Sequence, residues 1–333
     1  MPGKLVISLD FELMWGVRDH RSVAEYGDAV IGVRTALPMM LERFDAAGIR
    51  ATWATVGLLF AGTRDEVMDH RPALQPSYTN RSLSPYAFIE NGLGKDEASD
   101  PHNFGKSLVD RILDTEGQEL ACHTFSHYFC LEPGQTLDEF RADLEAARSI
   151  ASVRGVDYKS IVFPRNQWTE AHVAAAGEIG IETFRGDPPG IMYRSRPGEK
   201  NTLFVRGLRL ADSIVPVAER NDRAAMDVIA GLTDVTASRF LRTSRRLAGL
   251  VGDLQMRRVL SEMTRAAIDG RTYHLWWHPH NFGRNIEANM ARLDRIIAHF
   301  RSLHDKHGME SATMSDWGKG SIRPAASDVK QAG

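Results

Sequence analysis

The sequence lacks the marks of several large protein classes. Its 333 residues include only two cysteines, Cys122 and Cys130, which argues against a disulfide framework and fits a reducing compartment. No apolar run approaches the ~20 residues that span a bilayer. The net charge of -2 gives no global attraction to nucleic acid or to membranes. Neither a G-x-x-x-x-G-K-[ST] loop nor a strand-linked G-x-G-x-x-G occurs, so nucleotide hydrolysis and Rossmann-type cofactor binding have no support.

The N-terminal segment does not have the pattern of an export signal. The apolar run at residues 5–9 is too short for the core of a signal peptide, and Asp10 interrupts it. The composition, with 43% hydrophobic and 25% charged residues, is that of an ordinary globular chain. We therefore expect a cytoplasmic protein.

Short apolar runs alternate with helical patterns along most of the chain. In the helical segments apolar residues recur three or four positions apart, as at Leu137, Phe140 and Leu144. Such alternation favours a parallel sheet in an α/β fold, and residues 1–318 are compatible with one barrel domain. The small, polar residues 319–333 predict a disordered tail. The runs that predict buried strands are residues 5–9, 50–56, 118–122, 160–163 and 272–277.

Two stretches interrupt this alternation. Residues 62–103 contain many prolines and glycines, which predict a loop insertion that is either a functional lid or disordered. Residues 222–270 predict an extra helical insertion that is rich in arginine. A solvated helix packed on the barrel is the simpler interpretation of this segment. The alternative is a basic amphipathic helix on substrate phosphates or on the inner membrane surface, which would give the protein a peripheral contact with that membrane.

Side chains suited to catalysis or metal binding follow the carboxyl ends of the expected strands. In a parallel barrel these ends form one face, where catalytic residues gather. Asp10 and Glu12 lie two residues apart, so both carboxylates point to the same side of an extended chain. The complete set is Asp10, Glu12, His123, His127, Arg165, Asp187 and His278.

Glu12, His123 and His127 form a two-histidine, one-carboxylate set. Such a set suits Zn²⁺ with an open position for water, and also Co²⁺, Ni²⁺ or Fe²⁺. Water activated by the metal then becomes a nucleophile, and the metal polarises a carbonyl group. Asp10 is placed to take the proton of the water, and His278 could protonate a leaving amine. Asp10 could instead bind the metal in place of Glu12, so both carboxylates remain candidates for the third ligand.

Five segments resemble motifs of the polysaccharide deacetylases of carbohydrate esterase family 4, which share the NodB homology domain. Residues 123–127, H-T-F-S-H, match the family's H-[ST]-x-x-H motif in full. Residues 275–278, L-W-W-H, match L-x-x-H, whose histidine is the general acid of the family. Residues 8–12, S-L-D-F-E, match T-F-D-D-G in part. Asp10 there takes the place of the family's base, and Glu12 that of its metal-binding aspartate, one position late.

The remaining motifs match loosely. Residues 163–166, F-P-R-N, resemble R-x-P-Y, and this resemblance implies that Arg165 orients the base. Asp187 would replace the aspartate that holds this arginine. The resemblance covers residues 4–318, and the family fold that it implies is an irregular (β/α)₇ barrel. The implied reaction is the metal-dependent removal of an N-acyl group, most simply acetyl, from an amino sugar.

Two further segments resemble a bacterial subgroup associated with surface-polysaccharide biosynthesis, such as that of O-antigen. They are D-F-E-L-M-W-G at residues 10–16 and W-H-P-H-N-F-G at residues 277–283. The implied substrate is an acylated amino sugar on a nucleotide or lipid carrier inside the cell.

Three tryptophans and one histidine near the proposed face are candidates for substrate binding. Tryptophans in barrels are more often packing residues, and the histidine could equally lie on the surface. The candidates are Trp15, Trp168, Trp277 and His280. Three other functions remain open: removal of a formyl group, hydrolysis of a non-sugar amide as in allantoinase-like relatives, and carbohydrate binding without catalysis.

Overall fold

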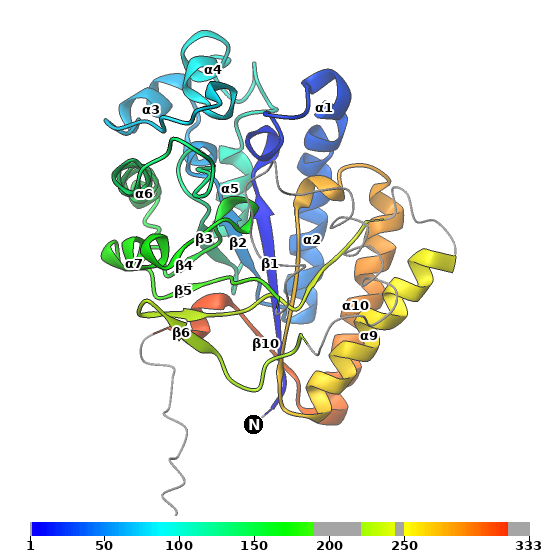
Figure 1. The fold of residues 1–333 in the computed structure, drawn as a ribbon. Helices are drawn as coiled ribbons and strands as arrows, with labels where there is room; N and C mark the ends of the chain where they lie inside the picture. The colour runs from blue at the N-terminus through cyan, green and yellow to red at the C-terminus, as the bar shows by residue number, and fades with distance from the viewer. Residues whose placement is uncertain (1, 189–220, 244–249, 319–333) are drawn as a thin grey trace, which may run out of the picture.

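The structure, a computed structural model, describes residues 2–188, 221–243 and 250–318 (Figure 1). Its strands form one curled sheet, and helices cover the outer face of that sheet. The fold class is therefore α/β with a barrel-like parallel sheet, as predicted. The predicted tail at residues 319–333 lies outside the described residues. The assignment of residues 1–318 to a single domain stays a prediction.

The central strand of the sheet is β1 (Lys4–Phe11). On one side it pairs along most of its length with β9 (Thr272–Trp277). On its other side it pairs with β2 (Thr52–Thr55) near its carboxyl end and with β10 (Glu310–Ala312) near its amino end. The order of the strands across the sheet is β6-β7-β5-β4-β3-β2-β1-β9-β8. Among these named pairs only the β6–β7 hairpin is antiparallel. The remaining strands are β3 (Glu119–Cys122), β4 (Ser160–Ile161), β5 (Thr183–Phe184), β6 (Asp227–Ile229), β7 (Leu232–Asp234) and β8 (Arg239–Phe240).

The longer helices lie between successive strands and have identifiable start and stop signals. Capping boxes begin two of them, with Ser22 and Thr136 each exchanging hydrogen bonds with a glutamate three residues later. Two others end at glycines in the left-handed conformation, Gly48 and Gly308. These helices are α1 (Val23–Ile31), α2 (Val33–Ala47), α5 (Lys106–Leu113), α6 (Leu137–Ser152), α7 (Glu170–Glu178), α9 (Leu250–Ile268) and α10 (Ile286–His307).

Alternation along the strands separates two sets of side chains. In β1 the odd-numbered residues from Leu5 onwards belong to the large core between sheet and helices, whereas Val6 lies in a smaller core inside the sheet. The odd-numbered residues of β9 likewise belong to the outer core. The even-numbered positions of both strands therefore face the interior of the curled sheet. Towards the carboxyl ends these positions carry Ser8, Asp10, His274, Trp276 and His278.

Residues 62–103 are more ordered than predicted. They lie over the carboxyl ends of the central strands and pack on the loops that follow those strands (Figure 1). The Tyr78 hydroxyl accepts a hydrogen bond from the Phe129 N–H at 2.8 Å, and the Trp15 indole donates to the Asn103 carbonyl at 2.7 Å. The prediction of a segment without secondary structure is therefore wrong, while a lid role stays a prediction. The segment contains α3 (Arg64–Asp69), a 3₁₀ turn at Arg81–Leu83 and α4 (Tyr86–Asn91).

The helical prediction for residues 222–270 is wrong in its first part. Three short strands, β6 to β8, occupy residues 227–240, and the helix begins only at Leu250. Ala230 and Gly231 have φ of 47° and 87°, and positive φ at both positions is the signature of the two-residue turn that joins hairpin strands. The hairpin extends the sheet at its β5 edge.

Two of the arginines of this region form buried ion pairs. Arg239 donates to both oxygens of the buried Glu262 carboxylate, at 2.6 and 2.7 Å, and Arg258 donates to one of them at 2.9 Å. The Tyr273 hydroxyl donates to the same carboxylate at 3.0 Å. Arg239 of β8 and Tyr273 of β9 therefore bind α9 to the sheet, and Arg258 pairs with Glu262 within α9. Neither arginine forms a membrane-facing surface. None of the helices that the structure describes has the length and hydrophobicity of a membrane span.

The loop after β9 packs directly on the backbone between α1 and α2. A Cβ at Gly283 would lie 1.8 Å from the Ala29 carbonyl oxygen, and one at Gly32 would lie 1.9 Å from the Gly283 carbonyl oxygen. Glycine is therefore required at both positions. The same loop carries His278 and His280, so this contact fixes the position of both imidazoles relative to the helices.

Gly283→Ala is expected to lower the free energy of unfolding by about 1–3 kcal/mol, because the new methyl group must displace backbone and not a flexible side chain. Gly177→Ala in α7 is the matched control, since its Cβ meets the Leu232 Cδ1 methyl at 3.0 Å. Urea denaturation of both variants and the unchanged protein measures the difference. Equal stability of the two variants would contradict the backbone contact.

Candidate active site

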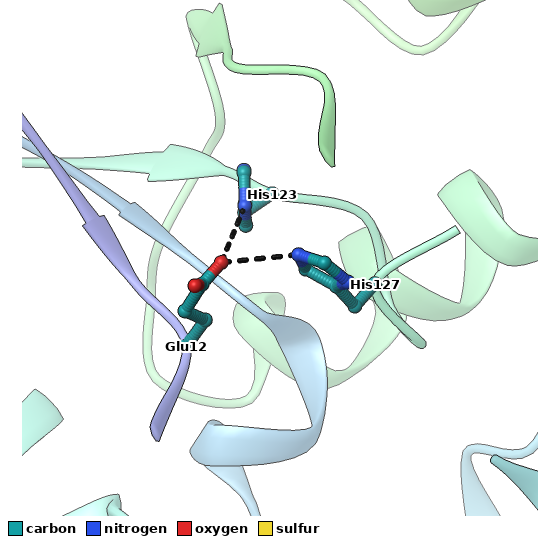
Figure 2. A group of neighbouring side chains, drawn as sticks. All are labelled: Glu12, His123 and His127. Carbon is teal, nitrogen blue, oxygen red and sulfur yellow. Dashed lines mark hydrogen bonds and ion pairs between the residues drawn. The ribbon is translucent and has the colours of Figure 1, made fainter. Parts of the chain in front are cut away.

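The predicted metal ligands converge at the carboxyl end of the sheet. Glu12 follows β1, and His123 and His127 follow β3. Both Nε2 atoms point at one carboxylate oxygen, because Glu12 Oε2 lies 3.3 Å from His123 and 3.0 Å from His127 (Figure 2). All three side chains are buried, and their ligand atoms lie within 4.8 Å of one another. Residues from two strands thus form one compact group that could hold a metal ion.

The turn that carries the two histidines is held by Asp143 of α6. The Asp143 carboxylate accepts hydrogen bonds from the Phe125 N–H at 2.6 Å and from the N–H and hydroxyl of Ser126. Thr124 and His127 have φ of 61° and 59°, in the left-handed region that residues other than glycine rarely adopt. The hydrogen bonds to one buried carboxylate offset this backbone strain, so the turn keeps both imidazoles directed at the same point.

The hydrogen bond of His123 fixes which of its ring nitrogens can bind a metal. Nδ1 lies 2.7 Å from the Val162 carbonyl oxygen, which can only accept, so Nδ1 carries the proton. In the neutral ring Nε2 then directs a lone pair towards the Glu12 carboxylate. Nε2 lies 3.3 Å from the Glu12 oxygen, a contact that is favourable when a cation lies between the two atoms or when Nε2 also carries a proton. Metal bonds of about 2.0–2.2 Å at tetrahedral angles separate ligand atoms by roughly 3.4 Å, so these residues fit a divalent ion.

The charge states of the group also suit a metal. Burial opposes the ionisation of Glu12, but His278 and the two histidines of the group outweigh it and hold the pKa of Glu12 well below its ordinary range. Burial lowers the pKa of His127, and the neighbouring Glu12 only partly opposes that effect. An ionised carboxylate and a neutral imidazole are the forms that bind a metal ion.

Two further histidines and a second carboxylate lie beside this group. His278 Nε2 is 3.5 Å from Glu12 Oε1 and 3.7 Å from Asp10 Oδ2. His280 stacks on His278 with ring centroids 4.9 Å apart, and its Nδ1 lies 3.9 Å from Glu12 Oε1. His280 therefore belongs to the site and not to the surface. Asp10 and His278 face each other next to the group of Glu12, His123 and His127, and their roles as base and acid stay predictions.

Arg185, and not Arg165, holds Asp10. The Arg185 guanidinium donates to both Asp10 oxygens, at 2.6 and 2.8 Å, and the residue is 1% exposed. Burial opposes the ionisation of Asp10, but Arg185 outweighs it and lowers the pKa of that carboxyl. Asp10 is thus bound by an arginine, and Glu12 is the carboxylate that faces both metal-binding histidines. The geometry favours Glu12 as the third ligand.

Arg165 lies at the rim of the site instead. It forms an ion pair with Asp19 and lies 4.0 Å above the Phe129 ring. The backbone at Arg165 and Asn166 is left-handed, with φ of 55° and 52°. This backbone sends Arg165 outwards and Asn166 inwards, where the Asn166 amide oxygen accepts a hydrogen bond from Arg185 at 3.0 Å. The predicted role of Arg165 is therefore wrong.

Two of the three tryptophans predicted to bind a sugar belong to the core. Trp15 is 2% exposed and Trp277 is 0% exposed, so neither ring is accessible for stacking. Trp277 is an odd-numbered residue of β9 and packs against Phe282, with ring centroids 5.7 Å apart. Trp168 is half-buried and lies edge-on to Phe184 at 5.1 Å. A sugar contact at Trp168 stays a prediction.

Sequence reasoning missed Arg185 and Trp276. Arg185 directly follows β5, so the rule of strand ends that selected Asp187 could have found it. Trp276 occupies an inward position of β9, and its ring lies 4.0 Å from the Arg185 guanidinium. Asp187 is half-buried two residues beyond Arg185, and its role stays a prediction.

No protein-family model and no curated protein matches the sequence. The solved structures that match in fold include two whose names assign them provisionally to the polysaccharide deacetylases. The structure from Mycobacterium smegmatis is 15% identical with a TM-score of 0.57, over 95% of this chain and 88% of that one. The structure from Pseudomonas aeruginosa PAO1 is 13% identical with a TM-score of 0.56, over 94% of this chain and 88% of that one. The chain shares their fold. Identities this low carry the fold alone.

The space that Glu12 occupies depends on Gly16. A Cβ at position 16 would lie 1.9 Å from the Glu12 carboxyl carbon, which is the end of a flexible side chain. Gly16→Ala should therefore displace the carboxylate and leave the backbone in place. We expect Gly16→Ala and His127→Ala to lose most of the zinc that the unchanged protein retains after gel filtration, as measured by elemental analysis.

Gly62→Ala is the control for this measurement, since its Cβ meets the Lys106 Cδ at 2.8 Å, in a side chain away from the metal-binding group. It should keep the zinc content of the unchanged protein. Circular dichroism checks that all variants are folded. Full zinc occupancy in folded Gly16→Ala and His127→Ala would overturn the assignment of Glu12 and His127 as ligands.

Asp143 predicts a pH-dependent stability. Burial raises the pKa of its carboxyl from about 3.8 to about 6, against the opposing hydrogen bonds from Ser126 and Phe125. Between these two values the folded protein holds a proton that the unfolded chain has released. This contribution to stability is therefore present at low pH and is lost as the pH rises through about 6.

Asp143→Asn removes this titration. Its stability relative to the unchanged protein should rise between about pH 4 and pH 7, by about 1.4 kcal/mol for each pKa unit of the shift. Urea denaturation at each pH gives the difference between the two proteins, in which other titrating groups cancel. A difference that does not change with pH would show that the carboxyl of Asp143 titrates normally.

Proposed function

We propose that the protein is a metal-dependent N-deacylase of the NodB type that acts on an acylated amino sugar. The observation that carries this proposal is the buried group of Glu12, His123 and His127, with Asp10 and His278 beside it. Hydrolysis of an amide by a metal enzyme requires this combination of metal ligands, base and acid. The fold shared with two structures named as polysaccharide deacetylases supports the same reaction.

Each residue of the site has a defined task in the proposed reaction. A bound divalent metal would polarise the amide carbonyl and lower the pKa of water. Asp10, which Arg185 keeps ionised, takes a proton from the water that attacks the carbonyl carbon. His278 gives a proton to the nitrogen as the C–N bond breaks. The products are the carboxylic acid and the free amine of the sugar.

The proposed substrate is an N-acetylated amino sugar on a nucleotide or lipid diphosphate, met inside the cell during surface-polysaccharide assembly. The support is that residues 10–16 and 277–283, which resemble the subgroup with this role, build the site itself. Arg242 and Arg292, together with Phe240, also line a small surface pocket. The Phe240 ring lies 5.7 Å from the His278 ring, so an anionic carrier in this region would be next to the acid. A lipid carrier would bring the protein to the inner membrane surface.

Zinc-loaded protein is expected to release acetate and a free amine from UDP-N-acetylglucosamine or from a lipid-diphosphate analogue of it. Asp10→Asn and His278→Ala should retain zinc and lose about 10²- to 10⁴-fold of kcat, because each removes a proton-transfer group and leaves the ligands intact. Acetate is measured by proton NMR, amine by a fluorogenic reagent, and zinc by elemental analysis.

His299→Gln, in α10, is the control and should keep the rate of the unchanged protein. Formate release from the N-formyl analogue without acetate release would identify a deformylase. Turnover of non-sugar amides alone would identify an amidohydrolase of another class. Binding of the sugars without turnover would identify a carbohydrate-binding protein. Unchanged kcat in both Asp10→Asn and His278→Ala would overturn the roles proposed for these two residues.

A further inference from the structure

A buried chain of hydrogen bonds continues from Asp10 into strand β9. Besides binding Asp10, Arg185 donates to Ser8 Oγ at 3.0 Å, and Ser8 Oγ lies 2.8 Å from His274 Nε2. His274 Nδ1 lies 2.9 Å from the Val235 carbonyl oxygen, which is the last group in this series of hydrogen bonds. Ser8 and His274 are both 0% exposed, so bulk water does not reach either side chain. The reaction proposed above assigns no task to these two residues.

The direction of every bond in this chain is determined. The Val235 carbonyl can only accept, so Nδ1 of His274 carries a proton. Burial, together with repulsion from Arg185, lowers the pKa of His274 to about 3, so the ring is neutral and Nε2 has a free lone pair. The Ser8 hydroxyl must then donate to Nε2. Its oxygen is left to accept from Arg185, which can only donate.

Strand β9 places further constraints on the same guanidinium. His274, Trp276 and His278 occupy successive inward positions of this strand and its end. The Trp276 ring covers the Arg185 guanidinium at 4.0 Å, and the Asn166 amide oxygen accepts from it at 3.0 Å. His278 lies 3.7 Å from the carboxylate that Arg185 binds. One strand therefore carries the proposed acid and also fixes the arginine that holds the proposed base.

We propose that His274 and Ser8 are positioning residues, which lock Arg185 in the orientation that binds both oxygens of Asp10 and so keep Asp10 in place beside His278. His274 performs this task as a hydrogen-bond acceptor for the serine. A leucine cannot accept that bond, whereas a glutamine amide can accept it and can also donate to the carbonyl at the end of the chain. The expected effect of changing His274 or Ser8 on turnover rests on the proposed deacylase function, whereas the chain of hydrogen bonds itself does not.

A merely structural role for these residues predicts a different behaviour. Buried polar groups are often retained because an unpaired group is costly, and removal of one then lowers stability without altering the chemistry of the folded fraction. A positioning role instead lowers kcat of the folded protein and leaves KM and zinc content unchanged. It also makes the effects of the two residues mutually dependent, since both act through one arginine.

The first test uses four zinc-loaded variants: Ser8→Ala, His274→Leu, His274→Gln and the Ser8→Ala/His274→Leu double variant. Ser8→Ala and His274→Leu should each lose roughly 10- to 100-fold of kcat with KM and zinc content unchanged. The double variant should be no slower than the slower single variant. His274→Gln should stay within a few-fold of the unchanged protein, because it keeps the acceptor.

The control for this test is a second histidine–hydroxyl pair, outside the site. His299 Nε2 lies 2.8 Å from Thr264 Oγ1. His299→Leu and Thr264→Ala should leave kcat unchanged. The proposal is overturned if Ser8→Ala and His274→Leu also leave kcat unchanged, if their losses multiply in the double variant, or if they lose zinc.

The second test does not depend on turnover. Apart from the rings whose Nε2 binds zinc, nitrogen-15 NMR of histidine-labelled, zinc-loaded protein should show a neutral Nδ1–H ring that does not titrate between about pH 5 and pH 8. His274→Gln assigns this signal by removing it, and Ser8→Ala should shift its Nε2 resonance. If the His274 ring proved to be the Nε2–H tautomer, or if its signal titrated near pH 6.5, the proposed chain of hydrogen bonds would be overturned. The expected signals in a protein that releases neither acetate nor formate would refute the deacylase function alone.

Discussion

Two carboxylates buried side by side set the conditions for the rest of the site. Asp10 and Glu12 are each 4% exposed at the end of one strand, and an unpaired buried charge costs several kcal/mol. Arg185, itself buried, balances the charge of Asp10. Glu12 faces His123 and His127, and burial favours the neutral form of His127, so the charge of Glu12 calls for a cation. The same electrostatic requirement that places an arginine beside the first carboxylate thus favours a metal beside the second.

Local rules of sequence were enough to find most of the site. Residues after buried strands gather at one face of a parallel sheet, and alternation tells which of them point inwards. Those rules cannot give the direction of a loop. Arg165 follows β4 as expected, but its left-handed backbone turns it to the rim, while Arg185 after β5 reaches the interior. The rules located Asp10, Glu12, His123, His127 and His278.

Predictions based on composition were wrong where a single turn decides the secondary structure or where the strand register decides which way a side chain points. The arginine-rich stretch looked helical because Ala230 and Gly231 are a less common choice than Asn-Gly for a hairpin turn. Trp277 drew attention as an aromatic ring next to His278. Neighbouring residues of a strand point to opposite faces, so Trp277 points away from the site and into the core between sheet and helices. Residues 62–103 lack helical periodicity, and their order comes from packing on distant loops, which sequence alone does not contain.

The carbonyl of Val162 has a consequence for how this group of residues would take up an ion. Because it retains the proton of His123 on Nδ1, the ring cannot leave the coordination position by moving that proton to Nε2. At this residue the incoming ion competes with one species, a second proton. Binding of an ion therefore requires no change of tautomer at His123.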